Sequence, residues 1–140
     1  MAPRRSLTIT RSPGQDGSPN HRYEALKPTT KVRLVMDDNG DRLATKIQQE
    51  KAVARVKLIG RDTEDDDMSS YLGGDKEVRS HHLGPNPLGD GLEAFFKFSN
   101  LVVNRTGIFK LSIAIYELKS DGREKRATEW KKSEQFYVFP

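Results

Sequence analysis

The feature that most constrains this chain is the strict alternation of apolar and other side chains over residues 108–118, IFKLSIAIYEL. Phe109, Leu111, Ile113 and Ile115 fall on one side of an extended chain, because successive side chains of a strand point to opposite faces. This period of two, rather than 3.6, is typical of a strand that is buried on one face only. The segment is therefore predicted to be a half-buried β-strand.

Other segments are predicted to be shorter strands, and turn signals separate them. Residues 31–36 and 52–59 repeat the alternation most clearly. The Asn-Gly pair at 39–40 and the Asp-Gly pair at 121–122 tolerate the positive φ angles of tight turns. The predicted strands are residues 7–10, 31–36, 52–59, 95–98, 101–103, 108–118 and 136–139.

Helical spacing is scarce in this sequence. Residues 41–51 carry two apolar side chains four positions apart, Leu43 and Ile47, so at most a short helix is predicted there. Several short strands, many turns and no alternation of strand with helix predict an all-β fold, an antiparallel β-sandwich with long loops. A length of 140 residues suits one domain of ordinary size.

Composition excludes several classes of protein. The chain has no cysteine, which excludes a disulfide scaffold, a cysteine-ligated zinc site and a thiol nucleophile. No apolar run approaches the roughly 18 residues that a membrane-spanning helix needs, and the N-terminal segment lacks the apolar stretch of a secretion signal. We therefore expect a soluble intracellular protein with no membrane partner.

Few residues suit catalysis. The three histidines, His21, His81 and His82, fall in predicted loops, and adjacent histidines on an extended chain point to opposite sides. The sequence contains no serine-hydrolase, zinc-protease or phosphate-loop motif. No catalytic residue, metal site or cofactor is predicted, and the chain is not expected to be an enzyme.

Charge is distributed unevenly along the chain. Residues 1–33 carry seven basic and two acidic side chains, whereas residues 61–92 carry three basic and eight acidic ones. The first 30 residues, which are rich in proline and glycine, are predicted to be a flexible basic arm, and residues 31–140 to be the folded domain. Residues 61–92 are predicted to be a long acidic loop within that domain.

A basic arm of this kind can follow the phosphates of duplex DNA and release their counterions. The predicted DNA-binding residues are Arg4, Arg5, Arg11, Arg22, Lys27 and Lys31. A separate hypothesis concerns the acidic cluster at 62–67, which could hold calcium between loops of a sandwich, although it lacks the glycine and distal glutamate of an EF-hand. The alternative for this cluster is a solvated loop.

The order of residues in the C-terminal half resembles that of the velvet domain, found in fungal regulators of development and secondary metabolism. The matching stretches are FFKFSNLVV at 95–103, GIFKL at 107–111, EL at 117–118 and SEQFYVF at 133–139. The N-terminal half resembles the family at residues 7–13 and 25–34. The family usually has a pair of arginines before its first proline, and Tyr23 and Glu24 occupy those positions here.

The resemblance implies an immunoglobulin- or Rel-like β-sandwich that binds duplex DNA and regulates transcription. It further implies a homodimer, or a heterodimer with another velvet-type protein, in the nucleus, and it leaves the cytoplasm open as a second location. The replacement of the arginine pair leaves an alternative open. In that alternative the chain is a velvet-fold interaction or dimerisation module without sequence-specific DNA binding of its own.

Overall fold

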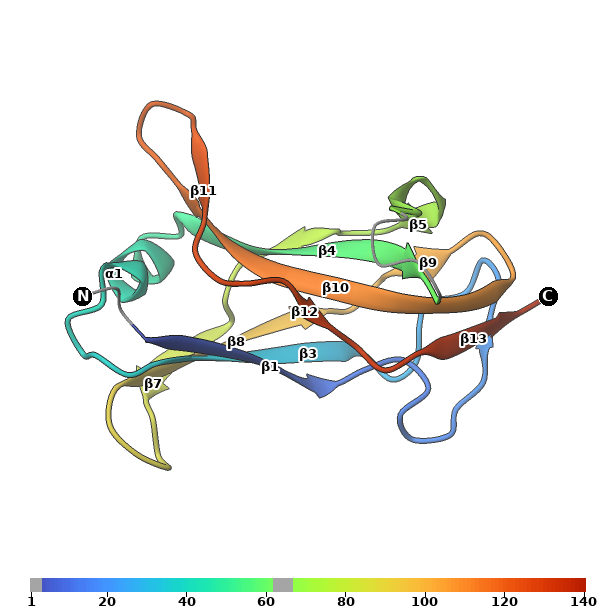
Figure 1. Ribbon diagram of the computed structural model, residues 1–140, viewed down its shortest axis with the longest axis horizontal. Helices are drawn as coiled ribbons and strands as arrows, with labels where there is room; N and C mark the ends of the chain where they lie inside the picture. The colour runs from blue at the N-terminus through green and yellow to red at the C-terminus, as the bar shows by residue number, and fades with distance from the viewer. Residues whose placement is uncertain (1–3, 62–66) are drawn as a thin grey trace.

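Two β-sheets face each other across one apolar core (Figure 1). The computed structural model describes residues 4–61 and 67–140, and strands account for 49% of these residues. The smaller sheet has the strand order β1-β3-β8-β7, and the larger one has the order β2-β13-β10-β4-β6, with β11 and β12 also paired to β10. A third sheet is the short pair β5-β9.

In chain order, the elements begin with the strand β1 and end with the strand β13. They are β1 Arg5–Arg11, β2 Asn20–His21, β3 Thr30–Met36, α1 Arg42–Gln48, β4 Ala52–Gly60, η1 Ser69–Tyr71, β5 Leu72–Gly73, β6 Glu77–Val78, β7 His82–Pro85, β8 Leu92–Phe98, β9 Val102–Val103, β10 Gly107–Leu118, β11 Glu124–Arg126, β12 Lys131–Lys132 and β13 Phe136–Phe139. Each predicted strand overlaps one of these, so the predicted mostly-β, antiparallel character is confirmed.

Strand β10 organises the larger sheet. It pairs antiparallel with β4 over nine residue pairs, from Phe109 opposite Gly60 to Glu117 opposite Ala52. Its other edge pairs in succession with β13, β12 and β11, and the sheet curls so that β12 approaches β1 of the smaller sheet (Figure 1). All pairs within the two main sheets are antiparallel except that of β2 with β13.

Alternating side chains from both sheets form the core. The predicted inward residues of β10 and the central strands are all buried, and together they remove a large apolar surface from water, which is the main force that stabilises such a fold. The central members are Val32, Leu34, Met36, Ala54, Val56, Leu58, Ala94, Phe96, Phe98, Phe109, Leu111, Ile113 and Ile115.

The outer face of β10 is also covered, which the alternation alone does not predict. Ser112 and Ala114 are buried there, although they alternate with the core residues. Long side chains of the same face lie over the sheet: the Lys57 ammonium is 3.9 Å from the centre of the Trp130 ring, and that ring packs edge-on against Tyr116. Cation–π contacts of this kind stabilise exposed sheet faces.

Helix α1 lies at one end of the core, within the range predicted for a short helix. Asp41 caps its N-terminus, since its carboxylate accepts a hydrogen bond of 2.9 Å from the Leu43 N–H. Leu43, Ala44 and Ile47 face inward and close that end of the space between the sheets. No helix among the described residues is long and apolar enough to cross a membrane.

The predicted flexible arm over residues 1–30 needs correction. From Arg5 onward the segment is part of the folded body: β1 pairs with β3 from Arg5 opposite Met36 to Arg11 opposite Lys31, and Leu7 is buried. Residues 12–29 form turns that pack on the core through Leu26 and pair β2 with β13. The proline and glycine residues therefore make tight turns here rather than a mobile tail.

The predicted long loop over residues 61–92 also needs correction. Residues 62–66 lie outside the described part of the chain. Beyond them the segment contains η1 and three short strands: β5 pairs with β9, β6 with β4, and β7 with β8. These strands are two to four residues long and are held mainly by backbone pairing, so they leave no apolar alternation in the sequence.

Candidate nucleic-acid interface

Three basic side chains form a row across the outer face of the smaller sheet. The register of β1 with β3 shifts between Ile9 and Arg11, and this shift sets Arg11 opposite Lys31 of β3. Lys31 is in turn paired with Lys97 of β8. Lys31 and Lys97 alternate with buried core residues, so both point away from the core. Adjacent strands are about 4.8 Å apart, which spreads the three charges over about 10 Å.

Like charges opposite each other destabilise a sheet unless something compensates for them. Within residues 4–61 and 67–140, Lys31 and Lys97 take part in no ion pair. The charge of Arg11 acts on one carboxylate, that of Asp16, and only weakly. Hydrogen bonds from Ser18 are the main cause of the lowered pKa of Asp16, and the Arg11 charge lowers it slightly further. The row is thus an exposed cationic surface that attracts anions.

The next side chain along β3 on the same face, Arg33, differs from Lys31 because its charge is paired with a carboxylate. Arg33 of β3 is two residues from Lys31, but its Nε donates to Glu93 at 2.9 Å and its Nη2 donates to Asn86 at 2.8 Å. Glu93 is itself buried, with its side chain 8% exposed, so this charge is neutralised inside the protein. Among the described residues of this face, the uncompensated positive charge therefore lies on Arg11, Lys31 and Lys97, which we call the basic row.

Two histidines extend the basic row at the β8 edge. His82 is paired with Phe95, which is on the same outer face as Lys97, and the two rings are 5.7 Å apart. The centre of the His81 ring lies 6.2 Å from that of the Phe95 ring. The backbone N–H of His81 donates a hydrogen bond of 3.0 Å to the backbone carbonyl of Phe95. Both histidines are exposed.

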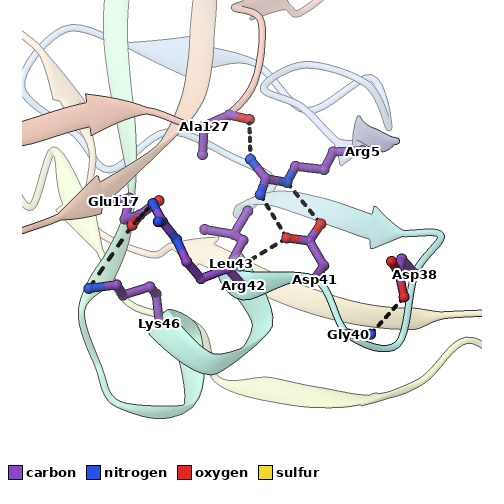
Figure 2. Close-up of polar contacts among 9 residues, drawn as sticks. All are labelled: Arg5, Asp38, Gly40, Asp41, Arg42, Leu43, Lys46, Glu117 and Ala127. Carbon is purple, nitrogen blue, oxygen red and sulfur yellow. Dashed lines mark hydrogen bonds and ion pairs between the residues drawn. The ribbon is translucent and has the colours of Figure 1, made fainter. Parts of the chain in front are cut away.

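Arg5, also among the predicted DNA-binding residues, lies apart from the basic row, and its charge is paired within the protein. Its guanidinium forms a bidentate pair with Asp41, at 2.9 and 2.7 Å, and also donates to the Ala127 carbonyl at 3.1 Å (Figure 2). Only 17% of the Arg5 side chain is exposed and none of that of Asp41. This charge joins β1, α1 and the larger sheet, so it stabilises the fold.

A second ion cluster lies beside it, around the buried carboxylate of Glu117. Glu117 near the end of β10 is 4% exposed, and its carboxylate accepts from Arg42 at 2.7 Å, with the Lys46 ammonium 4.0 Å away (Figure 2). Both cations come from α1. These contacts fix the helix to the larger sheet.

The Asp41 carboxylate titrates under opposing influences. Its burial by itself raises the pKa, but hydrogen bonds from Arg5 and from the Leu43 N–H, and the charges of Arg5 and Arg42, outweigh burial and hold the pKa below the ordinary value. Because the folded-state pKa is depressed, the stabilisation is present above the unfolded pKa and is lost as pH falls through the folded one.

The other predicted DNA-binding residues are exposed but lie apart from the basic row. Arg4 precedes β1, at the opposite end of that strand from Arg11. Arg22 follows β2, and its guanidinium lies 4.8 Å from the centre of the Tyr23 ring. Lys27 is in the turn before β3, where its backbone N–H donates to Asn20 at 2.6 Å. Of the six predicted residues, the sheet pairing brings together Arg11 and Lys31.

Lys97 belongs to the basic row but not to the predicted set. Its sequence context, FFKF, contains the signal that it points outward, because Lys97 lies between Phe96 and Phe98, which are both buried. What the sequence does not contain is the register that sets Lys97 opposite Lys31. That register depends on the association of two strands that are far apart in the chain.

The calcium hypothesis rests on residues 62–67, of which 62–66 lie outside the described part of the chain. Asp67 is described, and its carboxylate accepts from the Ser69 N–H at 2.9 Å, a hydrogen bond that lowers its pKa. Among the described residues, no group of three His, Asp or Glu side chains is placed to hold a metal ion.

Comparison of the whole chain with known protein families and with curated proteins finds no match in either.

Proposed function

We propose that this protein is a DNA-binding transcriptional regulator of velvet type, with a Rel-like or immunoglobulin-like β-sandwich, that acts in the nucleus. It binds the phosphates of duplex DNA through the basic row, and it works as a dimer with a second copy or with another velvet-type protein. The likeness of residues 95–139 to the velvet domain and the two facing β-sheets support this proposal.

The observation that carries the proposal is the alignment of Arg11, Lys31 and Lys97 on three adjacent strands. Duplex DNA carries a negative charge about every 1.7 Å along its axis, so a row of cations that spans about 10 Å meets several phosphates at once. Such contacts position a protein on DNA and do not read its sequence. The rigid sheet holds the cations in place, and base contacts come from the adjoining loops.

Removal of the basic row tests this function. The variant Arg11→Ala/Lys31→Ala/Lys97→Ala is expected to bind duplex DNA about 10- to 100-fold more weakly at low salt, because three phosphate contacts are lost. The slope of log affinity against log salt should fall by about 2 to 3, since each contact contributes about 0.9. Fluorescence anisotropy with a labelled random duplex, measured at several salt concentrations, gives both quantities.

The matched control removes the same charges elsewhere. Lys51, Arg123 and Lys125 are exposed and lie outside the smaller sheet, so their joint replacement by alanine leaves the net charge equal to that of the test variant. This control should keep at least half of the original salt slope. Equal losses in both variants would contradict a localised interface, and a wild-type chain that binds no duplex at low salt would overturn the function itself.

A second function is favoured by an aromatic patch on the larger sheet. Tyr23, Tyr137 and Phe139 are 65%, 50% and 47% exposed, and the rings of Tyr137 and Phe139 are stacked 6.2 Å apart. Exposed aromatic side chains of this kind are common at the centres of protein interfaces. In this alternative the chain is an interaction or dimerisation module of velvet type without sequence-specific DNA binding.

The alternative predicts a complex that depends on the aromatic patch. Tyr137→Ser/Phe139→Ser should dissociate a homodimer, or a complex with a co-expressed velvet-type protein, in sedimentation velocity experiments at micromolar concentration. Leu88→Ser, which changes an 84% exposed apolar residue outside the patch, should leave the complex intact. A chain that is monomeric, and that forms no complex with a velvet-type protein, would contradict this alternative.

A further inference from the structure

A ligand bound at the basic row would lie next to His81. It immediately precedes β7, its backbone is hydrogen-bonded to Phe95 of β8, and its ring packs beside the Phe95 ring at the edge of the outer face. On β8, Lys97 lies two residues beyond Phe95, on the same face, and Lys31 of β3 is opposite Lys97. The imidazole therefore lies near enough to the two lysines of the basic row for their charges to act on it.

The charges around His81 all oppose its protonation in the free protein. Partial desolvation of the ring is the largest influence and lowers the pKa of His81, and the positive charges of Lys97, His82 and Lys31 lower it further. Within the described part of the chain, no carboxylate is among the groups that shift its pKa. On the same face, Glu93 is engaged by Arg33, and Arg11 adds positive charge at the far end of the row.

We propose that His81 is a further phosphate-binding residue of the basic row, and that association with duplex DNA takes up a proton at its imidazole. This proposal rests on the proposed DNA-binding function and adds to it a residue and a dependence on pH. A histidine is suited to this role because its charge changes near neutral pH, whereas the lysines and arginine of the row stay charged.

The physical reason is linkage between two binding events. A phosphate placed over Lys31 and Lys97 offsets the positive potential that keeps His81 neutral, and the imidazolium then donates a hydrogen bond to a phosphate oxygen. Because the bound state holds the proton more tightly than the free state, affinity rises as pH falls through the range in which His81 titrates. Each unit by which binding raises the pKa gives up to about a tenfold change in affinity.

The test measures duplex affinity from about pH 8 to about pH 5.5 at constant salt, together with binding heats in two buffers of different ionisation enthalpy. The wild-type chain should bind about tenfold more tightly at the acidic end, and the difference between buffers should correspond to uptake of about half a proton in the middle of the range. His81→Gln should lose most of both effects and bind at all pH values as the wild type does near pH 8.

Two further variants separate this role from a merely structural one. His81→Lys carries a permanent charge, so it should bind near pH 8 as tightly as the wild type does near pH 5.5, with no proton uptake. His21→Gln, which removes a histidine on β2 of the larger sheet, should behave as the wild type does. Duplex binding without proton uptake, or with uptake unchanged in His81→Gln, would overturn this inference and leave the DNA-binding function intact. Absence of binding by the wild type throughout the pH range would overturn both.

Discussion

Replacement of Asp41 by alanine is expected to lower the free energy of unfolding by about 3 kcal/mol or more. The change leaves the Arg5 guanidinium, which is only 17% exposed, without its bidentate partner, and an uncompensated buried charge is costly. It also removes the N-cap of α1, which by itself stabilises a helix by about 1 kcal/mol. Urea unfolding followed by the fluorescence of the single tryptophan, Trp130, measures the loss as a lower midpoint at unchanged slope.

Asp38→Ala is the matched control for this prediction. Asp38 lies in the turn just before α1 and accepts a hydrogen bond from the Gly40 N–H, but unlike Asp41 it is exposed (Figure 2). Its replacement should cost no more than about 1 kcal/mol. Stability of the wild type should also decline in acid as Asp41 becomes protonated, and the Asp41→Ala variant should show a weaker decline. Equal effects of the two substitutions would contradict the role assigned to the Arg5–Asp41 pair.

The second large effect is expected for Phe96→Ala, which should cost about 3–5 kcal/mol. Phe96 is fully buried at the centre of β8, between the two sheets, and its replacement removes a ring from the shared core and leaves a cavity. Since stabilities of single domains are about 5–15 kcal/mol, the variant should be partly unfolded under mild conditions. Thermal and urea unfolding give the size of the change.

Two companion variants test the reason for that loss. Phe139→Ala makes the same chemical change at a residue that is 47% exposed, and it should cost less than about 1 kcal/mol. Phe96→Leu keeps most of the apolar volume and should cost far less than Phe96→Ala. If Phe96→Ala and Phe139→Ala destabilised the protein equally, the core would not lie between the two sheets as described.

The sequence predicts the strands well because apolar side chains, which form their inward faces, alternate with other residues along the chain. Val32, Leu34 and Met36 alternate with more exposed neighbours, and all three are fully buried in β3. The strands β6 and β7 were not predictable in the same way, since backbone hydrogen bonds to β4 and β8 hold them and few of their side chains are buried. Alternation reports burial of side chains, and a strand held by its backbone at a sheet edge carries little of that signal.

The candidate site was only partly predictable, because pairing between distant segments decides it. Arg4 and Arg5 are adjacent and of the same type, so the sequence does not distinguish them. In the structure Arg4 is exposed, whereas Arg5 points inward to Asp41, which is 36 residues away. Net charge over the first 33 residues gave no means to separate them. For Lys97 the local alternation does predict that the side chain points outward. Its position beside Lys31, however, follows only from the register of β3 with β8.

The most direct test of the basic row is an NMR titration of the isotope-labelled chain with a short duplex. At 15.9 kDa the protein is small enough for its backbone amides to be followed individually. The proposal predicts that the largest shifts cluster at Arg11, Lys31 and Lys97 and at the neighbouring His81, while Lys51 and Lys125 stay unchanged. Shifts centred on residues outside the smaller sheet, or none at a protein concentration well above micromolar, would contradict it.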